Sequence, residues 1–534
     1  MYGNELDNFR PDIPDLGQIP QFRLDSDVPV PDVNPASAQT VPDGDFDGFR
    51  LPELPLSGDL SVTDTALFKS VVEKYFSEDL QNYEAPSRVV PSDDDVEPDK
   101  KQCLLKDNGF GVGIPETELV RNLRYEEVDT IDQTEVRKQF PILDQKVNGK
   151  DLVWFDNGAS TQKPLRVIDG ISHFYKTDYS NIHRGAHTLA ARSTDQYEGA
   201  REKVARFINA PTTDNIVFVR GTTEGINLVA QTFGRKYLLE NDNVIVSTLD
   251  HHANIVPWQQ VCKERKAELR AIPVDKNGDL ILPELERLIT PRTKFISVGH
   301  VNNTFGTIND VKTIIKIAHS HNIPVLIDGA QSVAHTKIDV QDMDCDFFVF
   351  SGHKIYGPSG IGVVYGKKEA LDMLPPWQGG GNMIKDVTIE KTEFNEPPAR
   401  FEAGTPNIAD AIGLGYALDF VNSVGIHSIE RHEHDLTEYA RQQIALVPGV
   451  TLIGNPRNRV SVVSFDIPGI PAPQVGQMLD KEGIAVRAGH HCAQPALRAL
   501  GYEMSVRPTF AVYNTREEID RLVVALRKIV GNTK

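Results

Sequence analysis

From about Asp129 to the C-terminus, short apolar runs alternate with segments in which apolar residues recur at helical spacing. Each apolar run is followed by turn residues and then by a helical pattern. Such alternation of strands and helices predicts an α/β fold, in which helices cover both faces of a mostly parallel sheet. The expected strands include residues 152–155, 216–219, 244–247, 295–298, 325–327 and 347–350.

The first 125 residues have a different pattern. They contain 25 Asp and Glu against 11 Lys and Arg, and 13 of the 34 prolines. Their apolar content is too low to offset the entropy of ordering the backbone, so we expect this segment to be largely disordered. One amphipathic helix is predicted within 61–80, behind the start signal Ser61-x-x-Asp64. It either folds back on the same chain or docks on another protein.

Overall composition excludes several classes of partner. The net charge of −19 argues against nucleic acid and anionic membranes, which are polyanions themselves. No apolar run reaches the roughly 18 residues of a membrane span, and the N-terminus lacks the pattern of a signal peptide, so we expect a cytoplasmic protein. The four cysteines are scattered and contain no CxxC pair, which favours neither disulfides nor zinc.

A lysine follows the apolar run 347–350 in Ser351-Gly-His-Lys354. A lysine next to a buried strand is costly without a covalent or charged partner, and lysine amines form Schiff bases with carbonyl cofactors. Asp328 ends the strand one βαβ step earlier, where α/β sheets bind ligands. It can pair with a protonated pyridine nitrogen. An ordinary surface lysine and a capping aspartate are the alternatives, and the two residues together favour a pyridoxal cofactor.

Two further segments support this interpretation. Gly221-Thr-Thr-Glu-Gly225 opens a predicted helix, and a helix N-terminus favours a phosphate, although threonine there is often only a cap. Asp250-His-His-Ala-Asn254 is interpreted as the end of a strand, where an imidazole can stack on a ring and exchange protons near neutral pH. Adjacent histidines on a strand point in opposite directions and no third ligand is apparent, so we expect no metal.

The last chemical signal is the loop Arg487-Ala-Gly-His-His-Cys492. Thiolate is the reactive form of cysteine, and Arg487, His490 and His491 could stabilise it electrostatically. A buried structural cysteine is the alternative, but the loop is too polar for an apolar core. We therefore interpret Cys492 as a nucleophile.

Together these segments resemble the class V aminotransferase-like family of pyridoxal-phosphate enzymes, and within it the SufS-type (group II) cysteine desulfurases and the selenocysteine lyases. The resemblance extends from about Asp129 to the C-terminus. Its motifs are Asn181-Ile-His-Arg-Gly185, Arg220-Gly-Thr-Thr-Glu-Gly-Ile-Asn-Leu-Val229, His251-His-Ala-Asn-Ile-Val-Pro-Trp258, Ser351-Gly-His-Lys354, Arg400-Phe-Glu-Ala-Gly-Thr-Pro-Asn407 and Arg487-Ala-Gly-His-His-Cys492.

The resemblance implies a fold and its division into domains. It implies fold type I, with a large cofactor domain at 151–419 that holds a mostly parallel seven-stranded sheet. A smaller α+β domain is expected from 126–150 and 420–534. Residues 1–125 are no part of the basic family pattern. In placement and composition alone they resemble the cargo-loading segments of cysteine desulfurases packaged in encapsulin shells. A tether to another scaffold and a solubilising tail are the alternatives.

The resemblance also implies roles for individual residues. Lys354 would carry pyridoxal 5'-phosphate, Asp328 would face its pyridine nitrogen, Gln331 its ring hydroxyl, and His251 would stack on its ring. The residues implied for the phosphate are Thr222, Thr223, Ser351, His353 and, from the second protomer of a homodimer, Thr405. The residues implied for the substrate carboxylate are Arg507 and Asn303.

The implied reaction converts L-cysteine to L-alanine and leaves its sulfur on Cys492 as a persulfide. A SufE- or SufU-type partner would then take the sulfur for iron–sulfur cluster assembly or other sulfur mobilisation. Three alternatives stay open: selenocysteine lyase, another class V pyridoxal-phosphate enzyme, and a catalytically silent scaffold. The chemical residues argue against the last one.

Overall fold

The computed structural model describes residues 131–183 and 185–531. The predictions for residues 1–125, namely the disorder and the helix within 61–80, lie outside the described residues.

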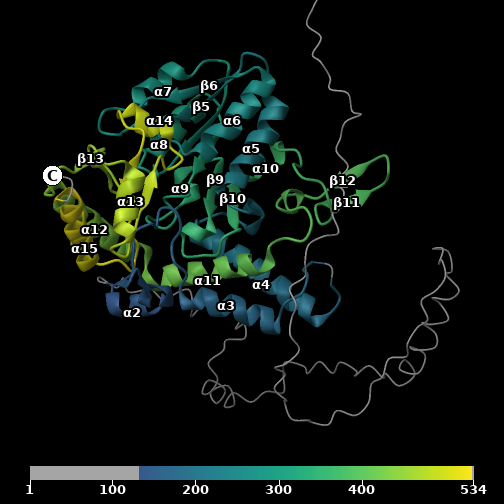
Figure 1. The fold of residues 1–534 in the computed structure, drawn as a ribbon. Helices are drawn as coiled ribbons and strands as arrows, with labels where there is room; N and C mark the ends of the chain where they lie inside the picture. The colour runs from purple at the N-terminus through teal and green to yellow at the C-terminus, as the bar shows by residue number, and fades with distance from the viewer. Residues whose placement is uncertain (1–130, 184, 532–534) are drawn as a thin grey trace, which may run out of the picture. The chain divides into compact units, whose positions relative to one another are not determined.

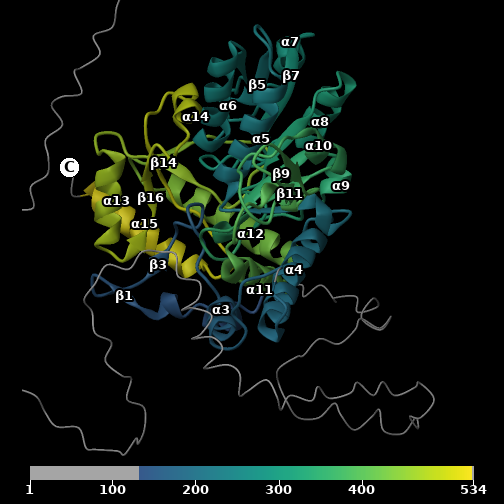
Figure 2. The ribbon, with the colours of Figure 1, turned by 90° about the vertical axis from the view of Figure 1, so that its right-hand side faces the viewer.

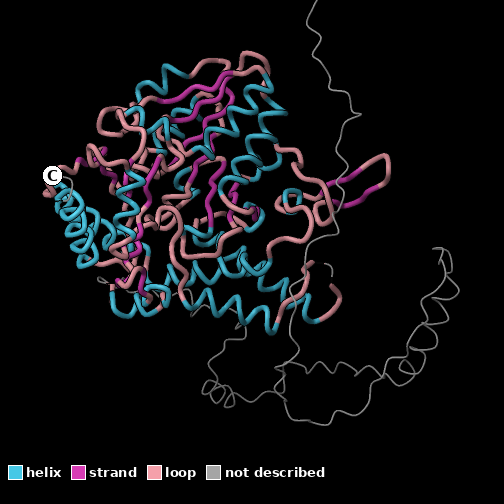
Figure 3. Tube along the Cα trace, viewed as in Figure 1, coloured by secondary structure: helices cyan, strands magenta, loops and turns pink. Residues whose placement is uncertain are grey.

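A seven-stranded sheet forms the centre of the fold (Figures 1 and 3). Its strands are β4 (Ile216–Val219), β5 (Asn243–Ser247), β6 (Glu268–Ile272), β7 (Thr293–Gly299), β8 (Val325–Asp328), β9 (Phe347–Ser351) and β10 (Gly362–Gly366). The spatial order is β4-β10-β9-β8-β7-β5-β6. All neighbouring pairs are parallel except those of β10, which is antiparallel to both β4 and β9. The expected mostly parallel, seven-stranded sheet of an α/β fold is thus confirmed.

Helices cover both faces of this sheet because its strands are apolar on both sides. In β9, Phe348 and Phe350 belong to one apolar cluster, whereas Phe347 and Val349 belong to the other. The helices of the first cluster are α3 (Leu165–Thr177), α4 (Thr188–Phe207), α7 (Leu282–Leu288), α8 (Val311–Ser320), α9 (Val340–Met343) and α11 (Ile408–Val424). The helices of the second are α5 (Thr222–Tyr237), α6 (His252–Arg265) and α10 (Lys368–Met373). Figures 1 and 2 show α3 and α4 beside α11.

The C-terminal part forms a smaller α+β unit with a four-stranded antiparallel sheet, as expected. Its strands are β13 (Thr451–Ile453), β14 (Ser464–Asp466), β16 (Arg487–Gly489) and β17 (Ser505–Arg507), and its long helices are α12 (Ile426–Ala445), α13 (Ala472–Asp480) and α15 (Arg516–Gly531). β15 (Ile484–Ala485) pairs in parallel with β3 (Val153–Trp154). Val153 and Phe155 therefore pack into the core of this unit. The domain boundaries at 150/151 and 419/420 remain predictions.

The remaining elements are short. They are α2 (Gln133–Lys138), η3 (Pro141–Asp144), β1 (Lys146–Val147), β2 (Lys150–Asp151), η4 (Thr213–Asn215), η5 (Gly352–Lys354), β11 (Ile384–Val387), β12 (Thr392–Phe394), η6 (Ala399–Phe401) and α14 (Gln494–Ala499). Within the part of the chain that the structure describes, no helix has both the length and the apolar character needed to cross a membrane.

Candidate active site

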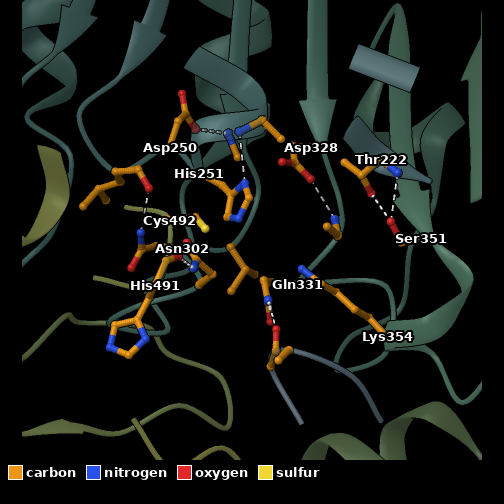
Figure 4. A pocket seen from close by; sticks show the side chains of 18 of the residues that line it. Thr222, Asp250, His251, Asn302, Asp328, Gln331, Ser351, Lys354, His491 and Cys492 are labelled. Atoms are coloured by element: carbon orange, nitrogen blue, oxygen red, sulfur yellow. Dashed lines mark hydrogen bonds between the residues drawn. The ribbon is translucent and has the colours of Figure 1, made fainter. Parts of the chain in front are cut away.

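A cavity of about 350 Å³ lies beyond the carboxyl ends of β5, β7, β8 and β9, and the loop that carries Cys492 contributes to its wall. This is the edge where open α/β sheets bind ligands. Most of the residues singled out from the sequence line it: Thr222, Thr223, His251, Asn303, Asp328, Gln331, Ser351, His353, Lys354, Cys492 and Arg507. Figure 4 shows Lys354, Asp328, His251 and Cys492 around one space. Thr405 and His490 do not line this cavity.

Lys354 enters this cavity from η5, directly after β9. Burial lowers the pKa of its amine to about 8, while the Asp328 carboxylate opposes this shift. Roughly one amine in eleven is therefore neutral at pH 7, far more than for an ordinary lysine. A neutral amine is what a lysine needs to attack a carbonyl group or to accept a proton.

Two carboxyl groups lie buried at the strand ends. Asp328 closes β8 and accepts a hydrogen bond from the Ala330 N–H at 2.9 Å; burial raises its pKa. Asp250 accepts hydrogen bonds from the N–H groups of Ser247 and Gly299, each at 2.6 Å, and so joins the ends of β5 and β7. Burial, reinforced by nearby Asp328, raises the pKa of Asp250 to about 7. The role of Asp250 was not predicted, although an acidic residue just beyond a strand end is a usable signal.

The structure corrects two expectations for His251. β5 ends at Ser247, and His251 is the N-cap of α6, with Nδ1 accepting a hydrogen bond from the Ala253 N–H at 3.0 Å. Burial and the charge of Lys354 lower the pKa of its imidazole to about 3. The ring is therefore neutral at physiological pH and carries its proton on Nε2. It can stack on a ring and donate a hydrogen bond from Nε2, but it does not titrate near neutrality as the sequence suggested.

One end of the cavity is built from hydroxyl groups and a helix N-terminus. Ser351 Oγ accepts a hydrogen bond from the Thr222 N–H at 2.8 Å and lies 2.8 Å from Thr222 Oγ1. Thr222 and Thr223 open α5, whose free N–H groups favour an anion. His353 lies beside them, and burial lowers its pKa to about 4, so its ring is neutral. This end suits a phosphate group.

Cys492 lies in a constrained loop in the wall of the cavity. His491 and Cys492 both have left-handed backbones, with φ of 53° and 55°. Two contacts hold this conformation: the Asn303 amide donates to the His491 carbonyl at 2.7 Å, and the His252 N–H donates to the Cys492 carbonyl at 2.8 Å. Cys492 is exposed, whereas Cys262 and Cys345 are buried. Among the cysteines that the structure describes, Cys492 alone is exposed and also lines the cavity.

The expected electrostatic support for the Cys492 thiolate is reduced by the structure. His491 is buried and bonded to Ser505, and burial lowers the pKa of its ring to about 2, so it is neutral. Arg487 is paired with Asp156 at 2.7 Å. The third residue, His490, accepts the Cys492 N–H at 3.2 Å.

Arg507 provides a buried cation with unused donors. Its Nη1 donates to the Asn303 carbonyl at 2.6 Å, whereas its Nε has no partner. Burial lowers the pKa of its guanidinium to about 10, which still leaves it charged at neutral pH. Arg507 lies opposite Arg487 across the β16/β17 ladder, and Asp156 contacts both, Arg507 only at 3.9 Å. The free edge of Arg507 fits a carboxylate.

Gln331 and Thr405 occupy different surroundings. Gln331 lines the main cavity and donates to the Gly158 carbonyl at 2.7 Å. Thr405 is exposed, lies outside the main cavity and accepts a hydrogen bond from the Asn181 amide at 3.3 Å. Within one chain, therefore, Thr405 does not join the other predicted phosphate residues.

Comparison with known proteins identifies the family. The model of the aminotransferase class-V family matches residues 153–522, and the chain belongs to this family. The expectation of a class V enzyme of the pyridoxal-phosphate kind is confirmed at the level of this family.

The relatives and the solved structure described next are each named as a cysteine desulfurase. A cysteine desulfurase of Synechococcus elongatus is 55% identical over 74% of this chain and 64% of its own length. One from Escherichia coli O8 is 48% identical over 75% of this chain and 98% of its own length. A crystal structure of the E. coli cysteine desulfurase CsdA matches with a TM-score of 0.70 and 38% identity, over 75% of this chain and 99% of that one. The chain spans 59–66% of the length of three relatives at 54–55% identity.

Proposed function

We propose that this protein is a pyridoxal-phosphate-dependent cysteine desulfurase, which converts L-cysteine to L-alanine and keeps the sulfur on Cys492 as a persulfide. The observation that carries the proposal is a single cavity lined by the Lys354 amine, the Cys492 thiol and the Arg507 guanidinium. These groups suit, respectively, a carbonyl cofactor, a sulfur atom and a carboxylate.

The residues present fit the cofactor. Lys354 would hold it covalently, Asp328 would face its pyridine nitrogen, Gln331 its ring hydroxyl, and His251 would stack on the ring. The residues proposed for its phosphate within this chain are Thr222, Thr223, Ser351 and His353. The neutral hydroxyl-lined end and the buried carboxyl of Asp328 match the two ends of such a molecule. When bound, the cofactor supplies an electron sink beside the substrate Cα.

The unused donors of Arg507 would grip the substrate carboxylate. Its Nε and the Asn303 Oδ1 are both buried without a hydrogen-bond partner in the described structure. An unpartnered buried donor is costly, so an incoming carboxylate at Nε would gain a charge-assisted bond without breaking another. The carbonyl of Asn303 holds Arg507 in place, and its amide fixes the loop of Cys492. Asn303 thus couples carboxylate binding to the position of the thiol.

The other two groups perform the chemistry on the substrate. The Lys354 amine, with its lowered pKa, would accept the Cα proton. The Cys492 thiolate would attack the substrate sulfur, so that a sulfur–sulfur bond forms while the substrate carbon–sulfur bond breaks. The bond pair stays with the carbon fragment, which takes up protons and leaves as alanine. The sum balances: Cys492 thiol and cysteine give Cys492 persulfide and alanine.

An alanine assay with matched cysteine variants tests this proposal. Cys492→Ala should abolish alanine formation from L-cysteine while leaving the bound cofactor in place. Cys262→Ala is the control, because burial raises the pKa of the Cys262 thiol to about 12 and keeps it unreactive. Full alanine production by Cys492→Ala would refute the role of Cys492.

Selenocysteine lyase activity is the second candidate, since Cys492 is the feature that separates the two chemistries. Selenium leaves carbon more readily than sulfur, so Cys492→Ala should still release alanine from selenocysteine. Loss of both activities in this variant would instead indicate that Cys492 supports the cavity as a whole. Another class V reaction would appear as alanine-free turnover of other amino acids.

A homodimer is proposed from the position of Thr405. Thr405 lies outside the main cavity of its own chain, beside Asn181, and its exposure leaves it available to a second copy. Thr405→Ala should weaken cofactor retention if the partner subunit supplies this contact. Mixing this variant with a Lys354→Ala chain should restore one intact site per heterodimer. No restoration would contradict the shared site.

The onward path of the sulfur is proposed from the exposed position of Cys492. We infer a SufE- or SufU-type acceptor, in the cytoplasm, that feeds iron–sulfur cluster assembly or other sulfur mobilisation.

For residues 1–125 we propose a tether to an encapsulin shell, because acidic, proline-rich sequence with short apolar anchors suits several weak contacts. A reporter fused to these residues and left outside co-expressed shells would refute the tether.

A further inference from the structure

The predicted phosphate end of the active site contains little positive charge of its own. The cavity there, about 640 Å³, has a single cationic side chain in its lining, that of Arg220. Arg220 is 78% exposed and paired with Glu224 at 3.0 Å, so it is largely neutralised and screened by water. The His353 ring is neutral at physiological pH. Hydroxyls, this neutral imidazole and the N-terminus of α5 would therefore face a phosphate dianion.

One half-buried lysine lies next to this end. Lys163 Nζ donates to the carbonyl of His353 at 3.3 Å and to the carbonyl of Thr161. Among residues 131–183 and 185–531, no carboxylate forms an ion pair with Lys163. Burial lowers the pKa of this amine to about 8, which leaves most of it charged at neutral pH. Its charge is close enough to the His353 ring to lower the pKa of that ring, after the larger effects of burial and Lys354.

The hydrogen bond of Lys163 to the His353 carbonyl does not explain why a cation is placed there. The His353 carbonyl already accepts from the Thr161 N–H at 3.0 Å, Thr161 Oγ1 at 3.2 Å and Ser160 Oγ at 3.2 Å. A carbonyl oxygen has two lone pairs, so these donors satisfy it without the lysine. A half-buried ammonium without an anionic partner is costly, and the cost is offset if a bound anion completes the site.

We propose that Lys163 is the cation that balances the phosphate of the bound cofactor, acting through space from behind His353. The inference rests on the proposed function, because it assumes that a phosphorylated cofactor occupies the cavity with its phosphate at the Thr222 and Ser351 end. Lys163 is thereby an electrostatic binding residue with no direct part in the reaction. A lysine suits this role because its ammonium is a compact point charge that needs no fixed bonding geometry.

The test compares two ligands that differ only in the phosphate. The dissociation constants of pyridoxal 5'-phosphate and of pyridoxal are measured on cofactor-free protein, for the wild type, Lys163→Met and Lys163→Arg. Removal of the charge should weaken pyridoxal phosphate binding about tenfold and leave pyridoxal binding unchanged, whereas Lys163→Arg should stay close to wild type. Because both ligands have the same aldehyde, any effect on Lys354 cancels in the comparison.

A purely structural role for Lys163 gives a different result. Loss of the bonds to Thr161 and His353 would weaken both ligands equally, which would overturn the proposal, as would unchanged binding of pyridoxal phosphate. Lys163→Gln retains a donor and serves as the neutral variant if Lys163→Met fails to fold. Failure of this inference is distinct from failure of the proposed function: wild-type protein that binds no pyridoxal phosphate contradicts the latter.

Discussion

The lowered pKa of the Lys354 amine is the property on which the chemistry of the site most depends. Burial lowers it from 10.5 to about 8 against the opposing carboxylate of Asp328. At pH 7 a pKa of about 8 leaves roughly one amine in eleven neutral, whereas the ordinary value of 10.5 leaves about one in 3,000. Burial therefore increases the reactive fraction roughly 300-fold.

Competitive acetylation of the cofactor-free protein across the pH range, with mass-spectrometric quantification of each lysine, measures this pKa directly. Lys354 should react with a midpoint near pH 8. Asp328→Asn removes the charge that raises the pKa, so the midpoint should move below 8. Lys138 is the internal control: it is exposed, and its hydrogen bond to Glu135 raises its pKa above 10.5. A Lys354 midpoint near 10.5, or an upward shift in Asp328→Asn, would refute the reasoning.

Three further predictions concern stability and substrate binding. Glu402→Gln removes one of the two anionic partners of buried Arg201, at 2.7 Å, and leaves Glu198 at 2.8 Å, so it should lower the free energy of unfolding by about 1–3 kcal/mol. Both variants are compared by urea titration. Glu264→Gln, which breaks an exposed pair with Arg235, should lower the free energy of unfolding by less than about 1 kcal/mol. Equal losses of stability in the two variants would contradict the argument. Asp250→Asn leaves one of two buried N–H groups without an acceptor, so unfolding should become easier by about 1–3 kcal/mol; no change would mean that water replaces the bond. Arg507→Lys loses the planar fork and should raise KM for cysteine about tenfold or more in the alanine assay, with kcat less affected. An unchanged KM would place the carboxylate elsewhere.

The sequence could predict the strands because each is a short apolar run between turn residues. The runs at 216–219 and 347–350 appear as β4 and β9, with ends that differ by at most one residue. β10 was not among the strands named from the sequence, and its direction could not have been predicted: it runs antiparallel to both of its neighbours, and an apolar run carries no signal for strand direction. β6 was also missed, because as an edge strand it is only partly buried and lacks a continuous apolar run.

The candidate site was predictable where a functional residue lies at or just after the end of a strand. Asp328 is the last residue of β8, and Lys354 lies in the short turn that follows β9. Because β8 and β9 are parallel neighbours, their carboxyl ends bring the two side chains together. The pairing of Asp156 with Arg487 could not be predicted, because the two residues are 331 positions apart in the sequence. The register of the smaller sheet brings them together, and the sequence alone does not give that register. Protonation states were also beyond reach, because the neutral rings of His251 and His491 result from burial in three dimensions.

The most direct test of the central claim follows the sulfur atom itself. The protein, loaded with cofactor, is given one equivalent of L-cysteine that carries a heavy sulfur isotope, then alkylated, digested and analysed by mass spectrometry. We predict one additional labelled sulfur on the peptide that contains Cys492, together with one equivalent of alanine. Labelled sulfur released as free sulfide, or found on Cys262 or Cys345 while Cys492 is unmodified, would contradict the account.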